Sequence, residues 1–252
     1  MIGRAHEYEA MATCETALWW YKCLHDYTIN ALKKNKVATN DAILDAGCGT
    51  GGLLKKIIAE EYSNLQGFDL SPDALEFASN ATGLPLKLYD ILEVSQHYEP
   101  NSFDVIISHD IICLLPEGKD ALAISQLFRV LKPGGLLIMN LPALSAFKGT
   151  HDLAVGITKR YTKQSIRSLV GEYGKIESMV YWPFLLSFPV YLTRLAQRAK
   201  LRNNSQKNFK SDVKMPDRML NELFYQLSNF ENRVMKAKPW GSSLFTLVRK
   251  EI

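Results

Sequence analysis

The sequence has few cysteines and no long apolar run, and each shortage excludes a class of protein. Its 252 residues include four cysteines, and none forms a Cys-x-x-Cys pair or lies near a histidine at metal-ligand spacing. A disulfide-stapled secreted domain is therefore excluded, and we expect no bound metal. Because the sequence also shows no secretory leader, the expected location is the cytoplasm.

The longest apolar stretch runs from Val180 to Leu192, and two prolines and a serine interrupt it. A membrane span needs about 20 apolar residues, so this stretch is too short to cross a bilayer. A basic segment follows it directly. Residues 184–202 are therefore expected either to roof an apolar pocket or to rest peripherally on an anionic membrane. The alternative is a helical subdomain with a solvated basic face.

Positive charge is concentrated in one part of the chain. The whole chain holds 30 basic and 26 acidic residues, a net charge of +4. Residues 192–218 alone contain eight basic and two acidic residues, so the remainder has a net charge of −2. A nucleic-acid-binding protein covered in positive charge is thereby excluded, and we expect no nucleic-acid partner. An anionic partner would meet this one segment.

Short apolar runs alternate with helical segments from residue 40 onward. Strands are expected at 42–46, 65–69, 86–89, 103–108, 136–140, 176–181 and 244–249. This rhythm predicts an α/β fold whose seven-stranded, mostly parallel sheet is covered by helices on both faces. Helices are expected at 7–35 and, with amphipathic spacing, at 216–236. Ser71, which precedes a proline, is expected to cap another helix.

A glycine-rich loop follows the first strand of this pattern. Gly47, Gly49 and Gly52 match the Gly-x-Gly-x-x-Gly spacing of nucleotide-binding loops, which also occurs in nicotinamide and flavin sites. Asp45 at the strand end distinguishes these ligands. Its carboxylate would repel a pyrophosphate but suits a ligand that carries an ammonium and a sulfonium. The loop therefore favours S-adenosylmethionine (SAM).

Two more acids end the next two strands. Asp69 can accept hydrogen bonds from both hydroxyls of a ribose, and Asp90 can accept one from the amino group of an adenine. Together with Asp45 they would line one crevice at the carboxyl ends of the strands. The alternative is that each acid caps a helix or belongs to a loop.

Four motifs resemble those of the class I SAM-dependent methyltransferases of the type 11 group. They are DAGCGTGG at 45–52, GFDLS at 67–71, YDI at 89–91 and RVLKPGGLLI at 129–138. The resemblance covers residues 40–142 and implies a Rossmann-like fold whose last strand is antiparallel. It assigns the methionine part of SAM to Asp45, Gly47 and Gly49, the ribose to Asp69 and Leu70, and the adenine to Asp90 and Ile91.

The domain plan follows from this resemblance. Residues 1–252 would form a single methyltransferase domain. Its expected parts are an N-terminal helical lid at 1–39, a SAM-binding core at 40–182, a helical cap inserted at 183–240 and a final strand at 241–252.

The segment after the fifth strand is similar to a subgroup with the pattern N-x-P-A, then HD, then RY. The sequence departs from that pattern at Ile157, where a second histidine is expected, and at Lys159, which replaces an arginine. The resemblance makes His151 and Tyr161 candidate catalytic residues beside the acceptor. The alternative is that Tyr161 packs under its helix and His151 bonds the loop backbone.

Two further residues are candidate cofactor contacts. His109 and Asp110 follow the fourth strand, where the reacting methyl group should project. Neighbouring residues of a strand point to opposite sides, so at most one faces the site, and we assign His109 to it. Trp20 is the candidate for an aromatic lid whose ring attracts the sulfonium. The alternatives are a strand end for His109 and core packing for Trp20.

The predicted function is SAM-dependent O- or N-methylation of a small, apolar or amphipathic acceptor in lipid, quinone or specialised-metabolite biosynthesis. Two alternatives stay open: a noncatalytic SAM-binding partner subunit, and an RNA or protein methyltransferase. The sequence after the fourth strand is Ser108-His109-Asp110-Ile111, which differs from the Asn-Pro-Pro-Tyr loop that methylates nucleobase amino groups. Proximity of acceptor and methyl group supplies most of the catalysis, and a base is optional.

Overall fold

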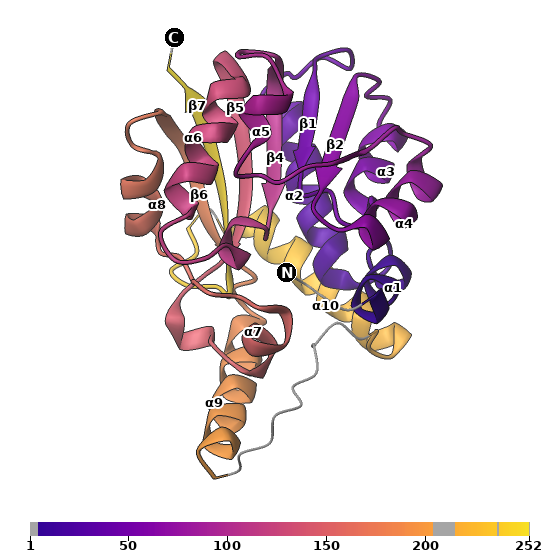
Figure 1. The fold of residues 1–252 in the computed structure, drawn as a ribbon. Helices are drawn as coiled ribbons and strands as arrows, with labels where there is room; N and C mark the ends of the chain where they lie inside the picture. Colours follow the sequence, from indigo (N-terminus) through magenta and orange to yellow (C-terminus); the bar gives the residue numbers. More distant parts are fainter. Residues whose placement is uncertain (1–4, 204–214, 236, 252) are drawn as a thin grey trace.

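A seven-stranded sheet forms the centre of the protein (Figure 1). The fold was obtained as a computed structural model that describes residues 5–203, 215–235 and 237–251. The strands are β1 (Ile43–Ala46), β2 (Leu65–Asp69), β3 (Lys87–Leu88), β4 (Phe103–His109), β5 (Leu131–Pro142), β6 (Gly174–Trp182) and β7 (Ser243–Lys250). They lie in the order β3-β2-β1-β4-β5-β7-β6, and β7 is antiparallel to both of its neighbours. This arrangement confirms the predicted Rossmann-like methyltransferase fold.

Helices cover both faces of the sheet. One face carries α2 (Trp19–Lys34), α3 (Gly52–Ala59) and α10 (Arg218–Val234). The other carries α5 (Val94–His97), α6 (Asp120–Val130) and α8 (Lys163–Val170). Successive β5 residues alternate between the two apolar clusters, as Leu137 and Ile138 do. Next to α3 lies α4 (Pro72–Thr82), whose start at Ser71 is confirmed by a hydrogen bond from the Ala74 N–H to the Ser71 hydroxyl at 3.3 Å.

The topology gathers the ends of six strands at one edge of the sheet. Strands β1 to β5 are parallel neighbours, and β6 is parallel to them because β7 is antiparallel to both β5 and β6. Their carboxyl ends therefore share one edge, which we call the carboxyl edge. The direction of winding reverses between β1 and β4. In open α/β sheets the ligand crevice lies at such a reversal, beyond the carboxyl ends.

The N-terminal region consists of two helices, α1 (Ala5–Cys14) and α2, so the prediction of one helix over 7–35 was wrong. The break at 15–18 has a tertiary cause. It lets Glu15 reach the glycine loop, where its carboxylate accepts a hydrogen bond from the Gly52 N–H at 3.0 Å. Leu24 and Leu32 of α2 are buried against the sheet. α2 is therefore part of the core, and α1 alone lies over the loop.

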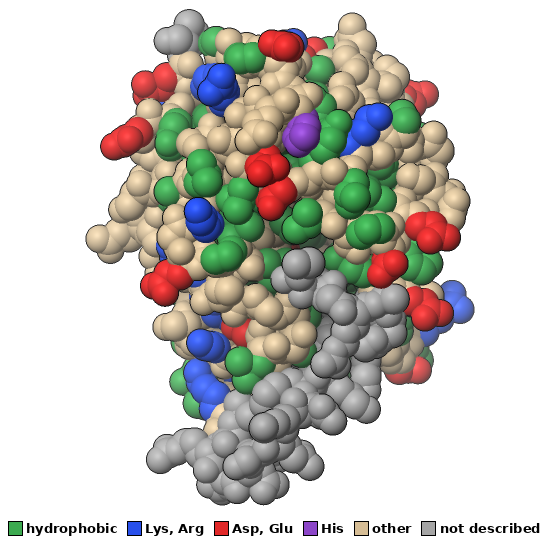
Figure 2. All heavy atoms as spheres, in the orientation of Figure 1, with side chains coloured by type: hydrophobic (Ala, Val, Ile, Leu, Met, Phe, Trp, Pro, Cys, Tyr) green, Lys and Arg blue, Asp and Glu red, His purple; other side chains and the backbone are tan. Residues whose placement is uncertain are grey.

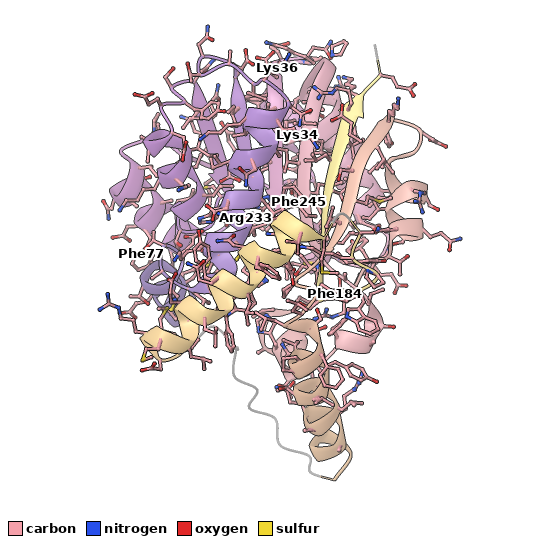
Figure 3. The ribbon with its side chains drawn as sticks, turned by 180° about the vertical axis from the view of Figure 1, so that it is seen from behind. Lys34, Lys36, Phe77, Phe184, Arg233 and Phe245 are labelled. Carbon is pink, nitrogen blue, oxygen red and sulfur yellow. The ribbon has the colours of Figure 1, made fainter. Side chains whose placement is uncertain are left out.

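The predicted cap contains two helices between β6 and β7. α10 matches the amphipathic helix expected at 216–236, and the Asp217 carboxylate caps it by accepting from the Met219 N–H at 2.9 Å. α9 (Ser187–Asn203) follows the end of β6 and extends away from the carboxyl edge in both ribbon views (Figures 1 and 3). Within the described residues, no helix is long and apolar enough to span a membrane.

Candidate active site

The glycine loop lies between β1 and α3 at the carboxyl edge. Gly47, Gly49 and Gly51 have φ values of 86°, 53° and 84°, a region in which a side chain is strained. A Cβ atom at Gly49 would also lie 2.6 Å from Cε of Met11 on α1. The loop therefore needs glycine both for its turn and for close approach by another part of the chain.

Asp45 ends β1 as a buried carboxylate without a partner. The residue is 3% exposed, and within 5–203, 215–235 and 237–251 no group hydrogen-bonds or ion-pairs with its side chain. Burial, followed by the charges of Glu15 and Asp69, raises the pKa of Asp45 to about 8. A cationic group would stabilise the ionised form. This environment fits the ammonium and sulfonium groups of SAM.

Asp69 at the end of β2 is held in a fixed position by the backbone. Its two carboxylate oxygens accept hydrogen bonds from the N–H groups of Gly49 and Ser71, each at 2.9 Å. Each oxygen keeps a second lone pair, so the group can still accept from ribose hydroxyls. Leu70 follows it and is exposed, with its side chain free to lie against a ligand.

The predicted adenine positions lie after β3. One Asp90 carboxylate oxygen accepts from the Leu92 N–H at 2.9 Å, which fixes the acid at the start of its turn. The Ile91 side chain is buried in the apolar cluster below α6. The predicted contact of Ile91 with an adenine would therefore be made by its backbone and not by its side chain.

Glu15, which directly follows α1, makes a contact that the sequence did not reveal. The Glu15 carboxylate accepts hydrogen bonds from the Thr50 hydroxyl and the Gly52 N–H, so it caps the first turn of α3. Burial raises the pKa of Glu15 to about 7. Beside it, a cavity of about 320 Å³ opens between α1, α3 and α4, with Lys55 and Phe77 in its lining. Glu15 could not have been found from spacing, because it is 35 residues from the loop in the chain.

Two titratable residues, His109 and Asp110, follow one another at the end of β4. His109 points toward α2, where its Nε2 lies 3.3 Å from the Thr28 hydroxyl oxygen. Burial lowers the pKa of His109 to about 3. Asp110 instead accepts a hydrogen bond from the Asn140 side-chain amide at 2.8 Å, and burial raises its pKa to about 7. Of these two residues it is therefore Asp110, which we had not assigned to the site, whose pKa lies near neutral pH.

Asp110 is also in an unusual backbone conformation. Its φ is 54°, a left-handed value that a non-glycine residue adopts at a cost in free energy. Its N–H donates to the Asn140 carbonyl at 2.8 Å, so β5 fixes both the backbone and the carboxylate. The Asp110 carboxylate is thus held rigidly at the carboxyl edge, beside the glycine loop, where the Ile111 side chain lies against Gly47.

Two tryptophans extend the hydrogen-bond network of Asp110 and Asn140. The Trp182 indole N–H donates to the Asn140 side-chain oxygen at 2.8 Å, and the Trp182 ring stacks on Trp20 with centroids 5.4 Å apart. Trp20 thus packs against the end of β6, whereas Met11 and Glu15 contact the glycine loop. This position favours the packing alternative for Trp20 over a lid on the sulfonium.

The HD…RY motif forms a structural clamp. Arg160 makes a bidentate ion pair with Asp152 at 2.6 and 2.8 Å and donates to the Ala143 carbonyl at 2.9 Å. Tyr161 is buried in the core, and its hydroxyl lies 3.4 Å from Asp120 on α6. The catalytic role predicted for Tyr161 gains no support from this position. His151, on α7 (Thr150–Val155), is half-buried and stays a prediction.

No three His, Cys, Asp or Glu side chains are grouped to hold a metal ion in the part of the chain that the structure describes. Three carboxylates, those of Asp45, Asp69 and Asp110, lie at the carboxyl ends of β1, β2 and β4.

The chain is similar in sequence and fold to known proteins. The methyltransferase domain family matches residues 38–174. Phosphoethanolamine N-methyltransferase 1 of Arabidopsis thaliana is 34% identical over 113 residues, 43% of this chain and 22% of that protein. EEF1A lysine methyltransferase 2 of Danio rerio is 29% identical over 134 residues, 48% of this chain and 57% of that protein. Phosphoethanolamine N-methyltransferase 2 of Haemonchus contortus, solved with SAM, has a TM-score of 0.57 at 18% identity, over 90% of this chain and 53% of that one.

The family match covers more than half of the chain and includes the glycine loop, Asp69 and Asp90. These are the positions at which the structure provides an unpaired acid and fixed hydrogen-bond acceptors. The cofactor is S-adenosylmethionine, and the chain belongs to the methyltransferase domain family.

Proposed function

We propose that the protein transfers a methyl group from SAM to a small, apolar or amphipathic acceptor. One observation carries this proposal. The half-buried Asp110, whose pKa is raised to about 7 by burial, follows β4 at the carboxyl edge, and the side chain of its neighbour Ile111 lies against Gly47 of the glycine loop. A carboxylate that is only partly exposed is reached more readily by a small molecule than by a folded protein or a nucleic acid.

The proposed cofactor contacts follow the positions of the acids. Asp45, with Gly47 and Gly49, would hold the methionine part, Asp69 and Leu70 the ribose, and Asp90 with the Ile91 backbone the adenine. When bound, SAM supplies an electrophilic methyl group on a sulfonium. His109 stays neutral at physiological pH because of its low pKa, so it would contribute shape and not charge.

We assign Asp110 the role of base. In its ionised form, the carboxylate would accept a hydrogen bond from the O–H or N–H of the acceptor. It would then take up the proton as the acceptor atom bonds to the methyl carbon and the carbon–sulfur bond breaks. Asn140 orients the carboxylate, and the Trp182 indole N–H orients Asn140. His151 is the second candidate on the acceptor side.

The finer assignment is a lipophilic acceptor that is reached at a membrane. Residues 184–202 would make peripheral contact with the bilayer, because they expose apolar side chains next to a basic segment. The names of the two relatives cover both a small-molecule and a protein methyltransferase. The names of these relatives therefore do not decide between a small-molecule and a protein acceptor.

The test is the fate of a labelled methyl group. Purified protein is incubated with methyl-labelled SAM and an extract of cells, which is then divided into protein, RNA and organic-soluble fractions. We expect label in the organic fraction. Label in protein or RNA alone would contradict the proposal, and no transfer to any fraction would favour a noncatalytic SAM-binding subunit.

Asp69→Ala tests the proposed ribose contact, and Asp73→Ala is its matched control. We expect Asp69→Ala to weaken SAM binding by more than about tenfold, roughly 1.4 kcal/mol, because the buried ribose hydroxyls lose a charged acceptor. Calorimetric titration measures the affinity, and label transfer should fall with it. Asp73→Ala, four residues away in the first turn of α4, should bind SAM as the native chain does. Unchanged affinity in Asp69→Ala would place the ribose elsewhere.

SAM affinity should depend on pH through Asp45 and Glu15. Their pKa values are raised to about 8 and about 7, so both are largely protonated below these values and ionised above them. Because the ligand is cationic, affinity should rise from about pH 6 to about pH 8.5 as the carboxyls ionise. Titrations at several pH values measure this slope, and Asp45→Asn should flatten it. A flat profile for the native chain would show that Asp45 does not face the cation.

A further inference from the structure

α9 carries an apolar face that no described part of the chain covers. Phe188, Leu192 and Leu195 lie at helical spacing on one side, and Phe188 is 61% exposed. The opposite side is polar and packs on the body, where the Thr150 N–H donates to the Gln197 side chain at 3.2 Å. Soluble helices normally turn their apolar stripe toward the core, so the arrangement of α9 is inverted.

α10 also exposes an apolar stripe. Met219, Leu223 and Phe230 are spaced four and seven residues apart, which brings them to one side of a helix, and their exposed fractions are 83%, 53% and 58%. The side that packs on the body mixes polar and apolar residues: Asn221 and Glu231 are buried, and the rings of Phe224 and Tyr225 pack against Trp19 and the core. The two helices adjoin where the Glu231 carboxylate of α10 accepts from the N–H groups of Phe184 and Leu185, just before α9. Exposed apolar stripes of this kind mark interaction sites.

Both helices lie at the carboxyl edge. α9 follows the end of β6, and the first half of α10 contacts the turn before α2, where the Trp19 N–H donates to the Asn221 side chain at 2.9 Å. Thr28 of α2 is level with the last residue of β4, so Trp19 lies beyond the edge. Figure 3, which shows the molecule from behind, has α10 crossing in front of α2 and α9 projecting below it. The apolar patch and the proposed acceptor site therefore share one end of the molecule.

The basic charge next to the apolar patch indicates which class of partner binds there. The sequence of α9 holds four basic residues and no acidic one. Figure 2 shows basic side chains gathered where α7 and α9 lie, and the Arg198 guanidinium donates to the Ala146 carbonyl at 3.1 Å on that side. Two copies of this chain would bring like charges together, whereas anionic headgroups complement them. Long basic side chains can reach headgroups while the apolar faces enter the interface.

We propose that the exposed apolar faces of α9 and α10 together form a docking surface for an anionic lipid bilayer. The surface is defined by Phe188, Leu192, Leu195, Met219, Leu223 and Phe230. This inference deepens the proposed function, because a lipophilic acceptor would enter from the bilayer at the same end as Asp110.

The test is co-sedimentation of the full chain with vesicles. One set contains phosphatidylcholine alone, and the other adds about 30% phosphatidylserine. We expect binding to the anionic vesicles to be at least about tenfold stronger, and to fall as salt is raised. Leu192→Glu on α9 and Phe230→Glu on α10 should each reduce it by about tenfold. Leu122→Glu on α6, where the residue is 38% exposed, is the matched control and should bind as the native chain does.

Several results would overturn the docking surface. They are equal binding to both vesicle sets, no binding to either, native-like binding by Phe230→Glu, and a concentration-dependent dimer that Phe230→Glu abolishes. Thermal unfolding and titration with S-adenosylhomocysteine check that each variant is folded. The two proposals fail separately: label transfer without vesicle binding rejects only the docking surface, and vesicle binding without label transfer rejects only the methyl-transfer function.

Discussion

Asp110→Asn should lower the turnover of methyl transfer by about 100-fold, within the range that a positioned base contributes. The substitution keeps the shape of the side chain and an oxygen that can accept from the Asn140 amide, which donates at 2.8 Å in the native chain. It removes only the ability to take up a proton. S-adenosylhomocysteine affinity should therefore stay within about twofold, and kcat should fall with little change in KM.

The pH profile separates this role from a structural one. In the native chain, turnover should rise with pH through about 7, because Asp110 acts when ionised and its pKa is raised to about 7 by burial. The variant should lose this rise. Asp104→Asn is the control on the same strand, where the carboxylate accepts from the Ala42 N–H at 2.9 Å, far from the carboxyl edge. Native turnover in Asp110→Asn would mean that the acid only closes the end of β4.

The parts of the site that could be predicted are those encoded by neighbouring residues. Gly47 and Gly49 adopt left-handed backbone, and Asp69 is the last residue of its strand, so local spacing was enough to predict these positions. Ser71 as a helix cap has the same local origin. Each of these features depends on residues within a few positions, and the structure places them as expected.

The parts that could not be predicted depend on distant residues. Alternation along β4 predicts that His109 and Asp110 diverge, but the left-handed backbone of Asp110 turns its carboxylate to the side chain of Asn140, the residue that pairs with His109. The break between α1 and α2 likewise depends on the contact of Glu15 with the glycine loop. Helical periodicity also cannot tell which side of α10 faces inward, since the buried Asn221 and Glu231 lie there and Leu223 and Phe230 are exposed.

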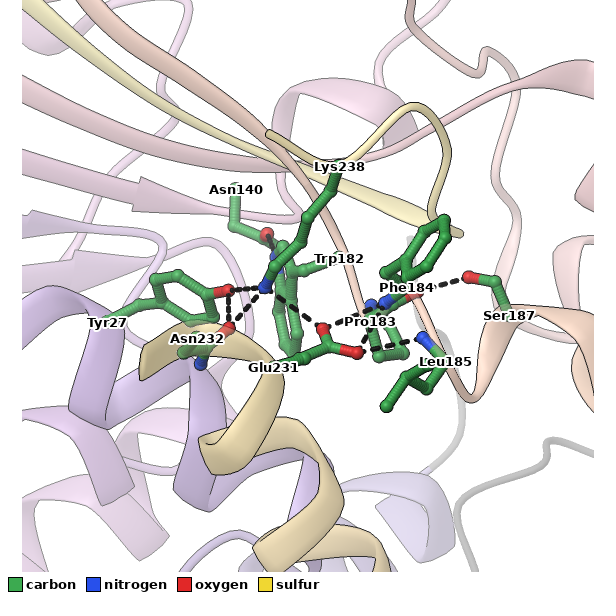
Figure 4. Close-up of polar contacts among 10 residues, drawn as sticks. All are labelled: Tyr27, Asn140, Trp182, Pro183, Phe184, Leu185, Ser187, Glu231, Asn232 and Lys238. Atoms are coloured by element: carbon green, nitrogen blue, oxygen red, sulfur yellow. Dashed lines mark hydrogen bonds and ion pairs between the residues drawn. The ribbon is translucent and has the colours of Figure 1, made fainter. Parts of the chain in front are cut away.

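Glu231→Ala should reduce the free energy of unfolding by about 3 to 5 kcal/mol, because it leaves a buried lysine without its counter-charge. Glu231 and Lys238 are each 1% exposed in their side chains, and Oε1 lies 3.0 Å from Nζ (Figure 4). The same carboxylate accepts from the N–H groups of Phe184 at 2.8 Å and Leu185 at 2.8 Å. It therefore joins α10 to the turn between β6 and α9.

Urea unfolding measures the loss, with an unchanged slope as evidence that the transition stays the same. Glu222→Ala is the matched control on the same helix. Its ion pair with Lys22 spans 3.4 Å and is exposed, so its removal should cost less than about 1 kcal/mol. Equal losses of unfolding free energy in the two variants would show that the buried ion pair stabilises the protein no more than the exposed one does.

The double variant Glu231→Leu with Lys238→Met shows which part of the network matters. Removing both charges avoids the unpaired lysine, so stability should recover in part. Recovery should be incomplete, because the N–H groups of Phe184 and Leu185 lose their acceptor, at about 1 to 3 kcal/mol for each buried donor. Full recovery would mean that charge alone governs the site. Incomplete recovery would show that Glu231 mainly holds the turn that sets the direction of α9.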